Sequence, residues 1–119
     1  MRCILRRMRG LLLVAALLSA IPAPAMAGAG NFIIFNATGR DITALSIRRF
    51  GTEGWQPLGA APPAGARGSV QFTDTDCAFD IRATLAGGVN AVWSGVNLCE
   101  AKALTLNRTE SGAVWVDYD

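Results

Sequence analysis

Alternation of apolar and polar residues is the clearest pattern in the chain. Between residues 77 and 85 every second side chain is apolar and the intervening ones are mostly polar; the apolar set is Cys77, Phe79, Ile81, Ala83 and Leu85. A period of two places successive side chains on opposite faces of a β-strand. We therefore predict a half-buried strand over 77–85.

A second strand should fold back on the first. Gly87-Gly88 supplies the positive φ angles of a tight hairpin turn, and residues 90–98 follow with the strand formers Val92, Trp93 and Val96. A fold-back centred on Gly88 places Cys77 opposite Cys99 and Ala83 opposite Trp93. The sequence thus predicts a disulfide-stapled hairpin.

The rest of the chain alternates in the same way, with turn residues between short apolar runs. No segment after residue 27 keeps a helical period of 3.6 over 11 residues. About seven strands separated by turns are typical of a sandwich or small barrel, and we predict an all-β, small antiparallel β-sandwich. Its strands are expected at 31–36, 42–50, 69–73, 77–85, 90–98, 103–107 and 114–118. The run Phe32-Ile33-Ile34-Phe35 is apolar on both sides, which predicts a strand covered on both faces.

Residues 1–27 have the composition of a secretory signal peptide. Four arginines precede the apolar run Leu11–Ile21, and Ala25-Met26-Ala27 forms a small-x-small cleavage site. The run is much shorter than the roughly 20 residues that cross a bilayer. We therefore predict cleavage near Ala27, one domain over 28–119, a periplasmic or secreted location, and no integral membrane span after processing.

Cleavage changes both the charge and the cysteine count. The chain has 11 basic and 9 acidic residues, a net charge of +2. Four of the basic residues lie in the leader, so the mature protein carries −2. Cys3 is also removed, which leaves Cys77 and Cys99 as an even pair in a compartment where disulfides persist.

Candidate chemistry is sparse. The chain contains no histidine, which removes the commonest general base and the commonest zinc ligand, and oxidised cysteines offer no thiolate. We predict a non-enzymatic protein without cofactor or metal. The enzymatic alternative is a carboxylate-dependent or calcium-assisted hydrolase that uses Asp74, Asp76 and Asp80. A further alternative is an inhibitor of a secreted hydrolase.

Binding is the remaining class of function. Trp55 follows the turn 51–54 and is the best candidate for a partly exposed ring, with core packing as its alternative. Arg48 and Arg49 are candidate contact residues and could form a small basic patch with Arg40 and Arg67. A net charge of −2 without a nucleic-acid motif excludes nucleic-acid binding. We expect an envelope protein as partner.

The hairpin also carries a resemblance. Cys77-Ala78-Phe79-Asp80-Ile81-Arg82, Trp93 and Asn97-Leu98-Cys99 resemble a group of small exported bacterial proteins with a Cys-x-x-Asp-x-Arg strand and a returning Trp-to-Leu-Cys strand. Residues 35–39 and 42–47 are similar to the same group. The function of these proteins is unassigned, so the resemblance implies export and a disulfide hairpin and no catalytic residue.

Overall fold

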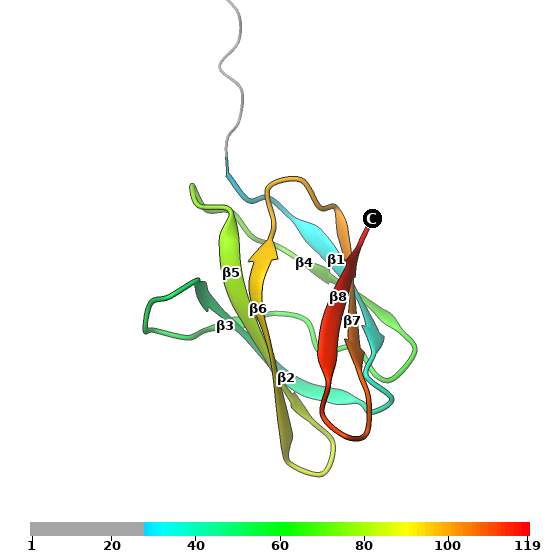
Figure 1. The fold of residues 1–119 in the computed structure, drawn as a ribbon. Coiled ribbons are helices and arrows are strands. Elements are labelled where there is room, and N and C mark those ends of the chain that lie inside the picture. Colours follow the sequence, from blue (N-terminus) through cyan, green and yellow to red (C-terminus); the bar gives the residue numbers. More distant parts are fainter. Residues whose placement is uncertain (1–27) are drawn as a thin grey trace, which may run out of the picture.

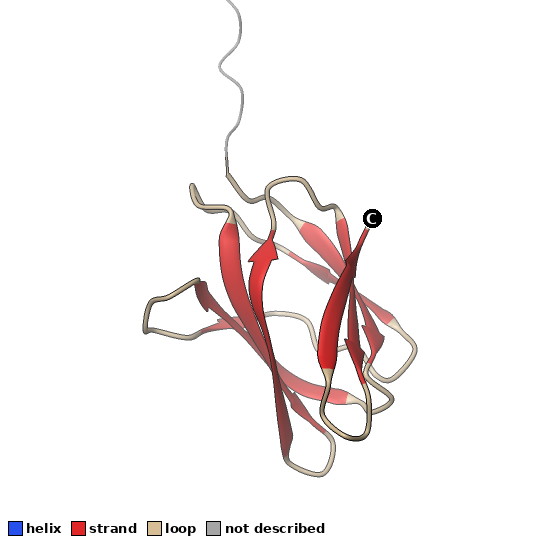
Figure 2. Ribbon diagram, viewed as in Figure 1, coloured by secondary structure: helices blue, strands red, loops and turns tan. Residues whose placement is uncertain are grey.

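Two four-stranded sheets pack face to face in the computed structural model, which describes residues 28–119 (Figures 1 and 2). The strands are β1 (Phe32–Ala37), β2 (Ile42–Arg49), β3 (Gln56–Leu58), β4 (Arg67–Val70), β5 (Ala78–Leu85), β6 (Val89–Asn97), β7 (Ala103–Arg108) and β8 (Val114–Tyr118). The all-β sandwich predicted from the alternation is confirmed. A search of the described residues finds no helix long and apolar enough to cross a membrane.

The strand order is β4-β1-β7-β8 in one sheet and β3-β2-β5-β6 in the other. Neighbouring strands run antiparallel except β1 and β7, which pair in parallel from Ile33 opposite Ala103 to Ala37 opposite Asn107. Five strands separate β1 from β7 along the chain, of which β4 returns to the same sheet on the other side of β1, and a connection of that length permits parallel pairing. The expectation of a purely antiparallel sandwich is wrong for this pair.

The core lies between the two inner faces. Large side chains from both sheets are completely or almost completely buried there; they include Ile34, Leu104 and Leu106 from one sheet and Ile81, Leu85 and Trp93 from the other. Because side chains alternate along each strand, these residues lie on the inner face of their sheet, as the sequence pattern predicted. The inner faces bury one continuous apolar cluster, which stabilises a domain of this size.

The hairpin of β5 and β6 confirms the disulfide but corrects its register. Ile81 lies opposite Trp93 and Ala83 opposite Ala91, so the turn is centred on Gly87 and the predicted pairing of Ala83 with Trp93 is wrong. A β-bulge between Phe79 and Ile81 then shifts the pairing by one residue. This shift brings the two cysteines together with a Cα–Cα distance of 5.0 Å.

The outer face of β1 is not covered within the described part of the chain. Ile33 and Phe35 point away from the core; Ile33 is 38% exposed and Phe35 is half-buried. The expectation that this strand is covered on both sides is therefore wrong for residues 28–119. Both apolar side chains lie on an open sheet face.

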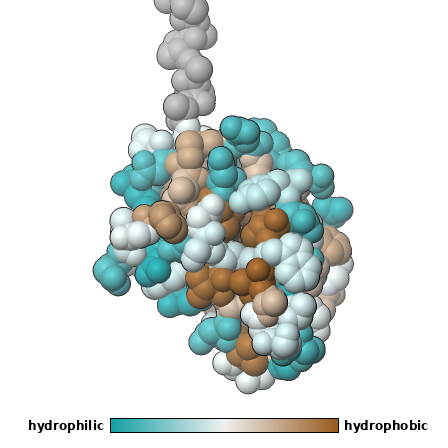
Figure 3. All heavy atoms as spheres, in the orientation of Figure 1, coloured by the Kyte–Doolittle hydropathy of each residue, from teal (hydrophilic) through white to brown (hydrophobic). Residues whose placement is uncertain are grey.

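The two sides of the sandwich differ in how they are closed. We call the side where the edge strands β6 and β8 meet the closed seam. There the backbone N–H of Asn97 donates to Tyr118 Oη at 3.2 Å and the indole N–H of Trp93 donates to the carbonyl of Asn107 at 3.0 Å. Figure 3 shows apolar atoms gathered over these strands. On the other side the edge strands are β3 and β4, which have only three and four residues.

Candidate functional site at the open seam

A groove runs along the side of β3 and β4, which we call the open seam. Two hollows of about 270 and 490 Å³ adjoin there and share Ile47, Gln56 and Phe72. Their apolar floor is completed by Leu58 and Phe79. Polar side chains surround this floor; they are Asn31, Arg48, Arg49, Thr52, Glu53, Gln71, Thr73 and Asp74. A concave apolar floor with a polar rim is typical of a ligand site.

The local sequence explains why this side stays open. Pro57 lies in the middle of β3 and has no backbone N–H, which limits further pairing of that strand. The strand predicted over 69–73 ends at Val70, because the N–H of Phe72 donates to Asn31 Oδ1 at 2.7 Å instead of joining the ladder. The segment after Val70 therefore borders the groove rather than closing it.

Phe72 forms the floor and is held by two other rings. It packs edge to face against Phe32 at 6.1 Å and Phe79 at 5.2 Å between ring centroids. Such contacts stabilise aromatic pairs beyond the burial of their area. The floor of the groove is consequently preformed.

An ion-paired cluster lies at one end of the groove. The Arg49 guanidinium contacts Asp74 Oδ1 at 2.9 Å and Asp76 Oδ2 at 3.1 Å, and the Asp76 N–H donates to Asp74 Oδ1 at 2.9 Å. The hydrogen bond from Arg49 lowers the pKa of Asp74 and in turn raises the pKa of Arg49. Both groups stay charged at neutral pH, so this end presents fixed charge of both signs.

Trp55 lies beyond the other rim, on the outer face of the sheet. Its ring centroid is 4.4 Å from the Arg48 guanidinium carbon and 4.3 Å from that of Arg82. Such cation–π contacts hold a half-buried ring in place. Trp55 is therefore neither a core residue nor a freely exposed platform.

Asp80 fixes the position of Arg48. This carboxylate is 2% exposed; it accepts from Arg48 Nε at 2.9 Å and from the N–H of Gly95 at 3.2 Å. Gly95 has a φ of +68° beside the bulge of the β5–β6 pairing. The buried Asp80 carboxylate thus connects the bulge of β6 to Arg48, which contacts the Trp55 ring.

The structure separates residues that the sequence analysis grouped. Arg48 joins Trp55, but Arg49 is the next residue along β2 and points to the opposite face, toward the loop with Asp74. Arg40 pairs with a glutamate at the end of the domain, and Arg67 lies over the Phe35 ring. The four arginines do not form one basic patch.

Arg82 and Phe72 were missed by the sequence analysis. Arg82 had a signal, because it alternates with Asp80 on the outward side of the predicted strand. Its contact with Trp55 depends on the pairing of Arg82 with Ser46 of β2, which the sequence does not show. Phe72 was assigned to a strand that ends two residues earlier.

The three aspartates of the hydrolase alternative are not gathered at one point. Asp74 and Asp76 share Arg49, whereas Asp80 pairs with Arg48 from the other face of β2. Within residues 28–119 no three aspartate, glutamate or cysteine side chains form a group that could hold a metal ion. The arrangement gives no specific support to a calcium site.

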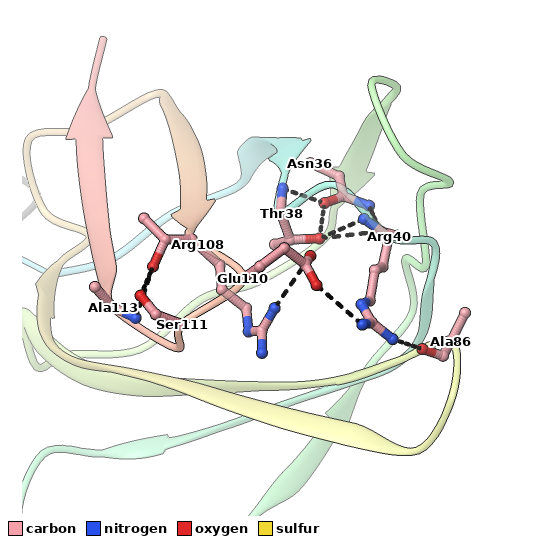
Figure 4. Close-up of polar contacts among 9 residues, drawn as sticks. Asn36, Thr38, Arg40, Ala86, Arg108, Glu110, Ser111 and Ala113 are labelled. Atoms are coloured by element: carbon pink, nitrogen blue, oxygen red, sulfur yellow. Dashed lines mark hydrogen bonds and ion pairs between the residues drawn. The ribbon is translucent and has the colours of Figure 1, made fainter.

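A polar network closes the end of the sandwich that carries the β5–β6 and β7–β8 turns (Figure 4). Asn36 is fully buried; its side-chain N–H groups donate to the carbonyls of Arg40 and Pro62, and its oxygen accepts from both the N–H and the hydroxyl of Thr38. Asn36 begins an Asn-x-Thr glycosylation pattern, but every polar group of its side chain is already hydrogen-bonded. Its role in the folded protein is structural.

Glu110 links two arginines beside this network (Figure 4). It accepts from Arg40 Nη2 at 3.1 Å and lies 3.7 Å from Arg108 Nη1. The hydrogen bond from Arg40 lowers the pKa of Glu110. Arg40 also donates to the carbonyl of Ala86 at 3.1 Å, so the ion pair ties the β5–β6 turn to the β7–β8 turn.

Comparison with known proteins supports the fold. The chain is similar to a protein from Eubacterium rectale whose structure was determined by NMR, with a TM-score of 0.53 and 14% sequence identity over 82% of this chain and 94% of that one. At this identity the likeness shows the fold alone. No family model and no curated protein matches the sequence. A functional conclusion therefore depends on the residues of the site.

Proposed function

We propose that this protein is an exported, non-enzymatic binding module of the cell envelope, and that the open seam holds an extended segment of a partner protein. The observation that carries the proposal is the groove itself, with Phe72 as a preformed apolar floor and polar side chains around it.

The groove suits an extended peptide for two reasons. It lies beside the edge strand β3, whose second edge has no neighbour in its sheet; because Pro57 offers no backbone N–H, a peptide beside this edge would be held mainly by side-chain contacts with the groove. The side-chain amides of Gln56 and Gln71 line the groove and can donate and accept hydrogen bonds. We expect the partner to place one apolar side chain over Phe72.

Export is the second part of the proposal. It is supported by the composition of residues 1–27, which lie outside the described residues, and by the Cys77–Cys99 disulfide. A structural disulfide persists in oxidising compartments and is rare in reducing ones. Fractionation of cells that express the full chain tests this part separately.

Site-specific photo-crosslinking tests the binding site. A photoreactive amino acid at Gln56, on the rim of the groove, should capture one envelope protein, whereas the same amino acid at Asn90, exposed on β6, should not. Gln71→Arg places a long charged side chain at the groove and should reduce capture at least tenfold; Asn90→Arg is the matched control and should leave it unchanged. Equal capture from both positions would contradict the proposal.

A further inference from the structure

We infer that two copies of this chain associate through the outer face of the sheet β4-β1-β7-β8, with a two-fold axis parallel to its strands. This inference concerns a surface away from the open seam. It depends on the composition of that face and on the order in which its residues follow one another across the sheet.

Half of the outward side chains of this face are apolar, and the face is uncovered within residues 28–119. Its outward side chains follow from the alternation along each strand: Arg67 and Ser69 of β4, Ile33, Phe35 and Ala37 of β1, Ala103, Thr105 and Asn107 of β7, and Trp115 and Asp117 of β8. Ile33 and Trp115 are 38% and 48% exposed. An exposed apolar patch of this kind marks an interaction site.

The two charges on this face have opposite signs and lie at its two edges. The pairing registers place Arg67, Phe35, Thr105 and Asp117 in one row across the four strands. The Arg67 guanidinium carbon is 5.3 Å from the Phe35 ring centroid, and Asp117 Oδ2 accepts from the Asn107 amide at 3.0 Å. In the described part of the chain, Arg67 has no ion-pair partner.

A two-fold axis along the strands makes this row complementary to itself. The axis lays β4 of one copy over β8 of the other, which brings Arg67 opposite the partner's Asp117 and, by symmetry, forms the same pair at the other edge. An axis perpendicular to the strands would instead place the two Arg67 residues opposite each other. Charge complementarity selects the first arrangement.

Side-chain size supports the same arrangement. The two central strands are exchanged by the axis, so large residues of β1 lie over small residues of β7. Ile33 then faces the partner's Ala103 and Phe35 faces the partner's Thr105, because each pair already shares a row in the sheet. Large side chains opposite small ones let two sheet faces interdigitate at the usual spacing of about 10 Å.

The size of the face sets the expected affinity. Four strands about 4.8 Å apart and about five residues long, at about 3.3 Å per residue, make a face of about 20 by 17 Å, whose planar area is less than half of the roughly 800 Å² per partner of a standard interface. We therefore expect a reversible dimer with a dissociation constant in the micromolar range. A second copy of the chain is the occupant that the self-complementary charges specify.

Sedimentation equilibrium on the processed protein, produced from the full chain, tests the inference. The wild type should dimerise at about 10–100 μM at low salt, and Ile33→Asp should weaken dimerisation at least tenfold. Arg67→Asp and Asp117→Arg should each weaken it at least fivefold, because each places like charges opposite one another. The double variant R67D/D117R restores opposite charges and should recover most of the loss.

Circular dichroism should show a folded protein for each variant, since all of the replaced side chains point away from the core. A wild type that stays monomeric at about 1 mM, far above the expected micromolar dissociation constant, would overturn the inference. A dimer that the single charge reversals leave unchanged, or that the double variant does not restore, would overturn it as well.

Discussion

The closed and open seams join the same two sheets with different outcomes. The closed seam has one long edge strand, β6 with nine residues, beside β8 with five, and a Trp93 ring that crosses between the sheets to a carbonyl of β7. The open seam has two short edge strands, a proline in one of them, and Phe72 held below a groove. This contrast indicates that the length of the edge strands and the bridging Trp93 ring decide which side of the sandwich is sealed and which is available to a ligand.

Removing the bridging ring should have the largest effect on this contrast. Trp93→Ala leaves a cavity in the core and an unpaired carbonyl on Asn107, so we expect a loss of about 3–5 kcal/mol in the free energy of unfolding. Urea titration measures it. Trp115→Ala, which removes an exposed ring, is the control and should change stability by less than about 0.5 kcal/mol in dilute solution.

Loss of the disulfide should rank second. The bond joins residues 22 positions apart and holds the end of β6 at the closed seam. Replacing Cys77 and Cys99 by serine should cost about 3 kcal/mol, chiefly through the unfolded chain. The variant should no longer respond to reductant in thermal melts. A wild-type melting temperature that reductant leaves unchanged would contradict this prediction.

Trp55→Ala should have a smaller effect, confined to the side of the open seam. It removes two cation–π contacts on a half-buried ring, and we expect a loss of about 1 kcal/mol. Phe50→Ala is the control, because Phe50 is 58% exposed and its loss should be nearly neutral. A loss above about 3 kcal/mol for Trp55→Ala would mean that the ring acts as a core residue.

A fall in pH should have the smallest effect, and it should loosen the open seam before the closed seam. The pKa of Asp74, at the open seam, is lowered in the folded protein by the hydrogen bond from Arg49. This ion pair therefore stabilises the fold above the ordinary carboxyl pKa of about 4 and loses that contribution as the pH falls through the lowered value. Hydrogen exchange should accelerate at Asp74–Asp76 before it does so in β6 and β8. Simultaneous acceleration would show that the seams are coupled.

The candidate site was only partly predictable from the sequence. Trp55 and Arg48 were each named as candidate contact residues from the sequence, but their contact with each other was not predicted. Arg82 was not linked to them, since its position depends on the pairing of β2 with β5, which are separated by two other strands along the chain. The groove depends on where β4 ends, and the hydrogen bond from the Phe72 N–H to the distant Asn31 side chain decides that point.

Local chemistry specified most of the strands and turns and the disulfide, but neither β3 nor the bounds of β4. Alternation fixes which face of each strand is apolar, glycine fixes the hairpin turn, and two cysteines admit one intramolecular bond. Four features depend on tertiary contacts: the register, the parallel pairing of β1 with β7, the opposite directions of the Arg48 and Arg49 side chains, and the seam that stays open. Each of these depends on contacts between residues far apart in the chain, where a shift of one or two positions leaves the local pattern unchanged and alters every partner.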